Sequence, residues 1–251
     1  MTSSALLSEI WVYPLKSCAG ISVRQSILTE TGLEWDRTWM VVNAQGAMVS
    51  QRQVPAMALI ETRLRAGDVV LRAPGMLALH LALDQAEAPT RVKIWGQELP
   101  AYDMGDLAAQ WLTDFLSQTP AGKALGPLRL ARFEPEHQRP SDPAWSQGHP
   151  GLNTFGDGFP LLVIGAASLQ EFNRRALEMG RPEVSMQRFR PNLVLAGLAP
   201  HEEDRVQRLS LQTPQGPVDI DLVKPCERCA IPDIDPEDAQ PDGAEIGRAH
   251  V

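Results

Sequence analysis

The sequence predicts a β-rich α+β protein with two or three helices, and three observations support that class. The first hundred residues are divided into short runs rich in β-branched and aromatic side chains, which is typical of strands. Segments 106–118 and 166–180 have patterns that predict helices. The 251 residues, 43% apolar and 22% charged, have the composition of one large or two modest globular domains.

The predicted strands of the first hundred residues follow one another at short intervals. The sequences NAQGA and RAGDV within them predict hairpin turns, because glycine adopts positive φ without strain. Strands at this spacing predict a small barrel or a curled sheet. The five strand-like runs span 8–15, 21–30, 37–52, 59–81 and 90–102.

The helix predicted at 106–118 follows these strands. Its apolar face is expected to consist of Leu107, Trp111, Leu112 and Phe115. Prolines and glycines in 120–127 then break the pattern. We place the boundary between an N-terminal domain, 1–122, and a second domain, 123–244, in this stretch.

A long segment with neither strand nor helix pattern, 134–158, lies inside the second domain. It is rich in Pro, Gly, His, Asp and Ser, and loops of this length in a compact protein are usually functional. A strand precedes it, and a strand, a helix ending at Gly180 and two more strand-like stretches follow it. These elements are expected at 128–133, 159–165, 166–180, 190–198 and 205–224.

Composition and charge argue against several functions. A net charge of −8 disfavours a general nucleic-acid or anionic-membrane binder, although it leaves room for a local basic pocket. No basic segment followed by a long apolar run opens the chain, and no window approaches the ~20 apolar residues of a membrane span. Three cysteines cannot form a disulfide framework, so we expect reduced thiols and a cytoplasmic protein.

The most unusual segment is VKPCERCAIPDIDP, 223–236, which holds two of the three cysteines. A zinc site would need further ligands, and neither Cys18 nor the histidines show the paired spacing for it. A thioredoxin-type pair should open a helix, which the prolines after Cys229 disfavour. A purely structural interpretation also stays open, in which both cysteines are small buried apolar side chains. Lys224 and Arg228, however, favour thiolate, the form that binds a soft or high-valent metal.

Five segments spread over the chain share their sequence and order with a known family. They are IWVYPLKSCAG, GLEWDRTWMVVNAQGAMVSQR, DGFPLLVIGAASL, RFRPNLVLAG and PCERCAIPDIDP. Together they resemble MOSC-domain proteins preceded by a MOSC N-terminal β-barrel domain, in the branch of the mitochondrial amidoxime-reducing component and its bacterial relatives. The resemblance extends from Glu9 to Asp238. It implies an N-terminal β-barrel-like domain followed by a MOSC β-barrel with a few helices.

The resemblance also implies a molybdenum cofactor, held by its pterin, its phosphate and one protein thiolate. The metal ligand and catalytic residue would be Cys229, the second cysteine of the PC-x-RC motif, with Cys226 a neighbour of uncertain role. In the animal relatives, hydroxyl residues stand at the positions of Gly158 and Phe159, so contacts here would use backbone amides. The implied pterin and phosphate contacts are Lys16, Ser17, Arg37, Asp157, Gly158, Phe159, Arg190 and Asn192.

The charges of the chain agree with a phosphate-bearing cofactor. An acidic protein that binds phosphate needs cations from distant segments, and arginine offers phosphate a planar fork. Arg228 is included among the predicted cofactor-binding residues, whereas Arg188 lacks motif support. Arg52 could equally brace the first domain, and Cys18 is expected to be a packed thiol. The candidate cations are Lys16, Arg37, Arg188, Arg190 and Arg228.

The function implied by the resemblance is a molybdenum-dependent oxidoreductase that reduces N-hydroxylated compounds by oxygen-atom abstraction at the Cys-ligated metal. No iron–sulfur cysteine set or dinucleotide fingerprint is present, so electrons are expected from an external ferredoxin, flavoprotein or cytochrome. The alternative is a sulfur-carrier or molybdenum-cofactor delivery protein with a persulfide-forming cysteine. It would meet pyridoxal phosphate only through a separate desulfurase. A cofactor-binding protein without catalysis is a third interpretation.

The end of the chain departs from the family pattern. The MOSC barrel of the family continues beyond the cysteine loop, so the second domain is expected to be truncated and its barrel incomplete. The final IGRAHV is also encoded by one frame of a common sequencing adapter, which predicts that 245–251 is an adapter-derived tail. An open barrel would leave strand edges unpaired.

Overall fold

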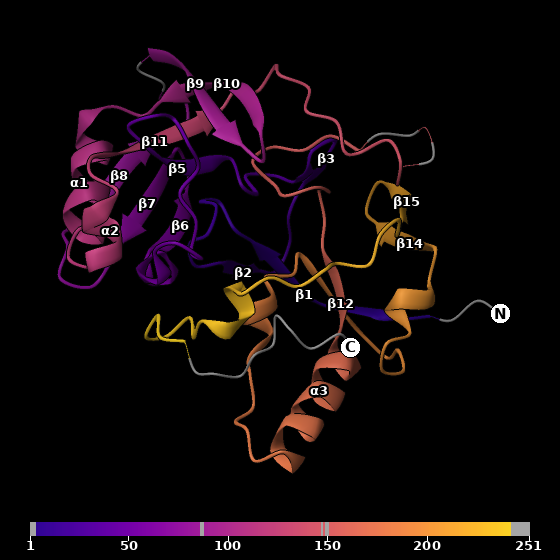
Figure 1. The fold of residues 1–251 in the computed structure, drawn as a ribbon. Coiled ribbons are helices and arrows are strands. Elements are labelled where there is room, and N and C mark those ends of the chain that lie inside the picture. The colour runs from indigo at the N-terminus through magenta and orange to yellow at the C-terminus, as the bar shows by residue number, and fades with distance from the viewer. Residues whose placement is uncertain (1–3, 86–87, 147, 149–150, 242–251) are drawn as a thin grey trace.

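The structure is a computed structural model that describes residues 4–85, 88–146, 148 and 151–241 of the chain (Figure 1). Within these residues, fifteen strands form five separate sheets beside three α-helices, which confirms the β-rich α+β class. None of these sheets closes into a barrel in the described part of the chain. The tail predicted at 245–251 lies outside the described residues.

The N-terminal half contains two antiparallel sheets around the larger hydrophobic core. Glycines in the left-handed region occupy the predicted hairpin turns, with φ 72° at Gly46 and 91° at Gly67. The four-stranded sheet has the order β5-β11-β10-β9, and the three-stranded sheet has the order β6-β7-β8. Their bounds are β5 Trp39–Asn43, β6 Glu61–Arg65, β7 Asp68–Arg72, β8 Leu79–Ala82, β9 Ala88–Ile94, β10 Gln97–Asp103 and β11 Leu128–Phe133.

Helix α1 (Asp106–Leu116) covers this core, and the prediction of its buried face is wrong for one residue. Trp111 and Phe115 are buried as expected, but Leu107 is 70% exposed. The buried positions recur three and four residues apart from Ala108 onward, so Leu107 lies one position out of phase with them. The predicted break that follows contains the short helix α2 (Pro120–Ala124), whose N-cap Thr119 accepts a hydrogen bond from the Gly122 N–H.

The second half is organised by a sheet in the order β12-β13-β1-β2, so the first strand of the chain lies at its centre. β1 pairs antiparallel with β13 and β2, and β12 pairs parallel with β13. Because β11 also pairs with β5 and β10, the predicted domains share strands, and their boundary stays a prediction. The bounds are β1 Leu6–Val12, β2 Ile21–Val23, β12 Val163–Gly165, β13 Leu193–Ala196 and α3 Ala166–Glu178.

Short elements complete the fold. Gly180, with φ 70°, follows the end of α3 as the sequence predicts. The described residues of the long loop 134–158 contain no helix or strand, also as predicted. The remaining elements are β3 Leu28–Thr29, β4 Gly32–Leu33, β14 Arg208–Thr213, β15 Gly216–Asp221, η1 Pro55–Leu59, η2 Met186–Phe189, η3 Glu203–Arg205 and η4 Ile231–Asp233.

The cysteine segment leaves the β14–β15 hairpin and runs to η4, which packs against η2 (Figure 1). Arg188 in η2 is only 6% exposed and donates to the Asp235 carboxylate at 2.6 Å. This ion pair fastens the end of the described chain to the second half. Arg188 is therefore a structural cation here. No helix among the described residues is long and apolar enough to cross a membrane.

Candidate functional site

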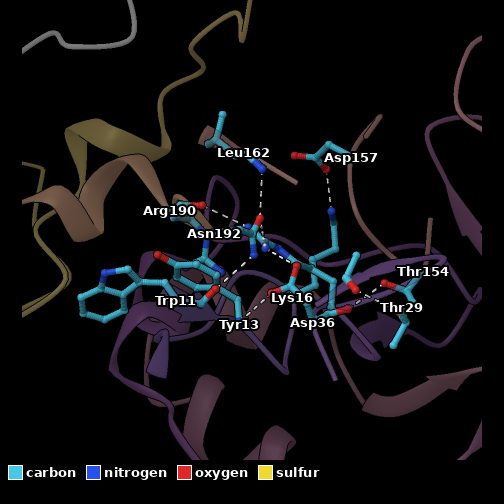
Figure 2. A network of polar contacts seen from close by, with 12 residues as sticks. Trp11, Tyr13, Lys16, Thr29, Asp36, Thr154, Asp157, Leu162, Arg190 and Asn192 are labelled. Atoms are coloured by element: carbon cyan, nitrogen blue, oxygen red, sulfur yellow. Dashed lines mark hydrogen bonds and ion pairs between the residues drawn. The ribbon is translucent and has the colours of Figure 1, made fainter. Parts of the chain in front are cut away.

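Most of the predicted site residues gather where β1 and β13 meet the loops that follow β1 and precede β12 (Figure 2). Tyr13 directly follows β1 and is 1% exposed. The Arg37 guanidinium carbon lies 4.5 Å from the centre of its ring, and that of Arg190 lies 4.3 Å away. Two cations from distant segments therefore contact one buried aromatic ring.

Arg37 is neutralised by its sequence neighbour. Asp36, 3% exposed, accepts a hydrogen bond from the Arg37 guanidinium and another, 2.8 Å long, from the Tyr13 backbone N–H. Burial lowers the pKa of Arg37, but the Asp36 carboxylate outweighs this effect and raises it. Arg37 also adopts φ 48°, which turns its side chain back toward Tyr13. The motif WDRTW thus carries both the cation and its counter-ion.

Asn192 joins three segments with its side-chain amide. Its Nδ2 donates to the Trp11 carbonyl at 3.1 Å, and its Oδ1 accepts from the Leu162 N–H at 3.1 Å and from Arg37 at 3.0 Å (Figure 2). It is 1% exposed. The structure therefore uses this predicted cofactor-binding residue as a cross-link between strands and the Arg37 guanidinium.

Arg190 differs from Arg37 because it forms no ion pair with a carboxylate among the described residues. It donates to the Cys18 carbonyl at 2.6 Å and adopts a left-handed φ of 56°. Burial lowers the pKa of Arg190, and the nearby charge of Arg37 lowers it further. Arg190 and Tyr13 line a groove of about 950 Å³ whose other walls include Gly20, Gln51 and Ile231 of η4.

Lys16 lies on the other side of this cluster and is paired with a carboxylate. Its side chain is 8% exposed, and its Nζ lies 2.5 Å from Oδ1 of Asp157, whose side chain is 72% exposed. Burial lowers the pKa of Lys16 to about 8, although Asp157 acts in the opposite direction. Packing raises the pKa of Asp157, but Lys16, the Trp95 indole and Arg37 outweigh that and lower it to about 2.

Sequence reasoning missed Arg139, which fixes the loop that carries Asp157. Arg139 is 5% exposed and donates to the carbonyls of Thr154 at 2.8 Å, Gly156 at 2.6 Å and Asp157 at 3.2 Å. Its Nε also donates to Gln97 at 2.9 Å. Nothing local distinguishes this arginine, since it lies in a loop with no pattern.

The remaining predicted pterin contacts lie close to this cluster. Ser17 is 4% exposed with φ 67°, in the turn between Lys16 and Cys18. Cys18 is fully buried in the main core, which confirms the expected packed thiol. Gly158 accepts a hydrogen bond from the Asn153 amide at 3.3 Å, and Phe159 is partly buried beside it.

The cysteine loop is more exposed than the cation cluster. Cys229 is partly buried, Cys226 is exposed, and the Arg228 guanidinium carbon lies 5.2 Å from the centre of the Phe189 ring. Although the Cys226 residue is exposed, surrounding protein atoms desolvate its thiol and raise its pKa, and the Asp157 charge adds to this effect. Among the described residues, no hydrogen bond, ion pair or ring contact joins Cys229 or Arg228 to Lys16, Arg37 or Arg190, and no three His, Cys, Asp or Glu side chains come together as a metal site.

Comparisons with known proteins identify the family of the chain. The family model described as MOSC N-terminal beta barrel domain matches residues 4–119, and that of the MOSC domain matches 150–249. Mitochondrial amidoxime reducing component 2 of Bos taurus is 32% identical over 92% of this chain and 67% of its own length. Mitochondrial amidoxime-reducing component 1 of Homo sapiens is 31% identical over 92% of this chain and 66% of its own.

The chain spans about two thirds of the length of these relatives. A Bordetella bronchiseptica protein solved in solution is 27% identical and covers 45% of this chain and 92% of its own, with a TM-score of 0.34. Both domain models and the curated relatives agree on one assignment. The chain belongs to the family of MOSC-domain proteins with a MOSC N-terminal beta barrel domain, which includes the mitochondrial amidoxime-reducing components.

Proposed function

We propose that this protein binds a molybdenum cofactor and reduces N-hydroxylated compounds, as the names of its amidoxime-reducing relatives suggest. The observation that carries the proposal is the state of Arg190. A partly buried guanidinium that packs on the Tyr13 ring and has no carboxylate partner among the described residues favours binding of an anion. Arg190 also lines a groove of about 950 Å³, which has room for a cofactor-sized ligand.

The residues present fit such a cofactor. Arg37 and Arg190 converge on Tyr13 from two segments, and the Arg37 charge also acts on Lys16, so cations from three segments are available to a phosphate group on this acidic protein. Cys229 would supply the thiolate ligand. When bound, the cofactor supplies the two-electron chemistry that removes oxygen from nitrogen.

The chain's own residues have supporting tasks in this proposal. Arg190 and Arg37 hold the anionic end of the cofactor, while Tyr13 fixes both guanidinium planes. Asn192 maintains the orientation of Arg37. Electrons come from a separate ferredoxin, flavoprotein or cytochrome type of donor.

The experiment is to produce the full chain in a host that makes the cofactor and to measure bound pterin by fluorescence after oxidation. Wild type should carry pterin, and Arg190→Met should lose it, while Arg205→Met, an exposed arginine in η3, should not. Benzamidoxime reduction with a chemical electron donor then tests catalysis. Absence of pterin from wild type contradicts the proposal. Cyanide-releasable sulfur without molybdenum would instead support the sulfur carrier.

A further inference from the structure

The Lys16–Asp157 ion pair is asymmetric in a way that a purely structural pair does not require. The lysine side chain is 8% exposed, whereas the aspartate side chain is 72% exposed. The Lys16 ammonium is fixed inside the protein, whereas most of the Asp157 side chain already faces solvent, so its carboxylate can move into water without a desolvation cost. Lys16 is therefore the fixed member of the ion pair, and Asp157 is the member that can leave.

Among the described residues, Asp157 is the acidic group that forms an ion pair with Lys16. The other charged groups that act on Lys16 are Arg37 and Arg139, and both are cations. Asp36 is already engaged with Arg37. If Asp157 turned away, another anion would have to neutralise the Lys16 ammonium, or the ammonium would lose its proton.

The loop geometry allows the Asp157 side chain to move while its backbone stays in place. Arg139 holds the carbonyls of Gly156 and Asp157. The Asp157 side chain is itself 72% exposed, so solvent borders it. Rotation of this side chain toward solvent would move the carboxylate away from the Lys16 ammonium.

Trp95 holds the carboxylate in its present position. Its indole N–H donates to Oδ1 of Asp157 at 3.1 Å, the same oxygen that accepts from Lys16. Trp95 is 48% exposed, with a left-handed φ of 49°, and the Arg52 guanidinium carbon lies 4.7 Å from its ring centre. A half-exposed, strained tryptophan in the β9–β10 turn is unusual, and such strain concentrates at functional positions.

We propose that Asp157 is a displaceable counter-ion. Clamped by Trp95, it neutralises Lys16 while the site lacks a ligand, and a phosphate group takes its place on Lys16 when the ligand binds. This inference rests on the proposed function, because the phosphate is that of the bound cofactor. Trp95 is a positioning residue in this scheme, since it acts on Lys16 through Asp157.

The scheme has a definite dependence on pH. Burial, Arg37 and Arg139 lower the pKa of Lys16, and Asp157 is the group that raises it. Without Asp157, Lys16 therefore loses its proton at a lower pH than in wild type. Removing the aspartate should therefore strengthen phosphate binding most at low pH, and this advantage should decrease as pH rises, because Lys16 of the variant loses its proton before Lys16 of wild type.

The test is calorimetric titration of the full chain with inorganic phosphate at pH 6 and pH 8.5. Asp157→Asn should bind phosphate about threefold more tightly than wild type at pH 6, the factor expected for a partly exposed ion pair. The advantage should disappear at pH 8.5. Asp84→Asn, which makes the same charge change at an exposed site, should match wild type at both pH values.

Trp95→Phe provides a second variant that keeps the ring near Arg52 and removes only the N–H donor. It should strengthen phosphate binding at pH 6 in the same direction as Asp157→Asn, by a smaller factor. Equal or weaker binding by both variants at pH 6 overturns the proposal, as does absence of phosphate binding in every protein. Pterin content is measured separately. If wild type carries pterin but both variants bind phosphate with wild-type affinity, the displacement of Asp157 is refuted while the proposed function stands.

Discussion

The buried cation cluster and the cysteine loop are both parts of the candidate site, yet they are constructed in opposite ways. In the cluster, Asp36 and Asn192 are at most 3% exposed, and each binds several partners. In the loop, Cys226 is exposed and Cys229 only partly buried. The part of the site proposed to bind an anion is thus held in place by buried contacts, and the proposed thiol ligand lies in a more exposed loop.

This difference separates effects on stability from effects on function. A substitution in the cluster removes contacts that hold strands together, so it should reduce both stability and ligand binding. A substitution in the loop removes few contacts and should leave stability unchanged.

The largest effect is expected for Asp36→Ala. This change leaves the buried Arg37 without its counter-ion and the Tyr13 N–H without its acceptor. We expect a loss of about 4 kcal/mol in the free energy of unfolding, measured by urea denaturation. Asp114→Ala on the exposed side of α1 is the control and should change stability by less than about 0.5 kcal/mol. A loss below about 1 kcal/mol for Asp36→Ala would contradict the account.

The next effect concerns the pH dependence of stability that Lys16 causes. The pKa of Lys16 is about 8 in the folded protein, compared with its ordinary value of 10.5, which applies to the unfolded chain. Between these pH values the unfolded chain therefore binds the Lys16 proton more strongly than the folded protein does. Stability should therefore rise with pH across that interval, by up to about 3 kcal/mol relative to Lys16→Met. Urea denaturation of both proteins from pH 7 to 10.5 measures the difference. A constant difference would show that Lys16 titrates normally.

A smaller loss is expected for Asn192→Ala. The substitution leaves the Trp11 carbonyl and the Leu162 N–H without their side-chain partner. Buried backbone groups left unsatisfied cost about 2 kcal/mol in the free energy of unfolding. Arg37 also loses one contact, so pterin content should fall together with stability. Full pterin content in a destabilised variant would indicate that Asn192 serves the fold alone.

The smallest effect is expected for Cys226→Ser, which should change the free energy of unfolding by less than about 0.5 kcal/mol. Thiol labelling with a chromogenic disulfide gives a second measurement on the wild-type protein. Cys226 should react in the native state, whereas Cys18, fully buried, should react only after urea unfolding. Rapid native labelling of Cys18 would contradict the described core.

The sequence predicted the parts of this molecule that local patterns determine. Alternation and turn glycines such as Gly46 and Gly67 indicated strands and hairpins. Motifs singled out Lys16 and Arg37, which the structure places against Asp157 and Tyr13, and their contact with a cofactor stays a prediction. Leu107 was assigned to the wrong helical face, because four apolar positions do not determine the phase of the helix to within one residue.

Tertiary contacts decided the rest, and no local pattern records them. Arg139 acts through carbonyls of a loop without secondary structure. Trp95 meets Asp157 across 62 residues of sequence. Asn192 was expected to contact the cofactor, yet its amide is occupied by backbone groups of β1 and of the segment before β12, which only the folded sheet brings together.

The central claim is that the buried cations and the Cys229 thiolate hold one molybdenum cofactor. The most direct test is the molybdenum content per chain, measured by mass spectrometry, of wild type, Cys229→Ser and Cys226→Ser produced in a host that makes the cofactor. The account predicts molybdenum in wild type and Cys226→Ser and its loss in Cys229→Ser, with all three proteins equally stable. Molybdenum retained in Cys229→Ser, or absent from wild type, would contradict it.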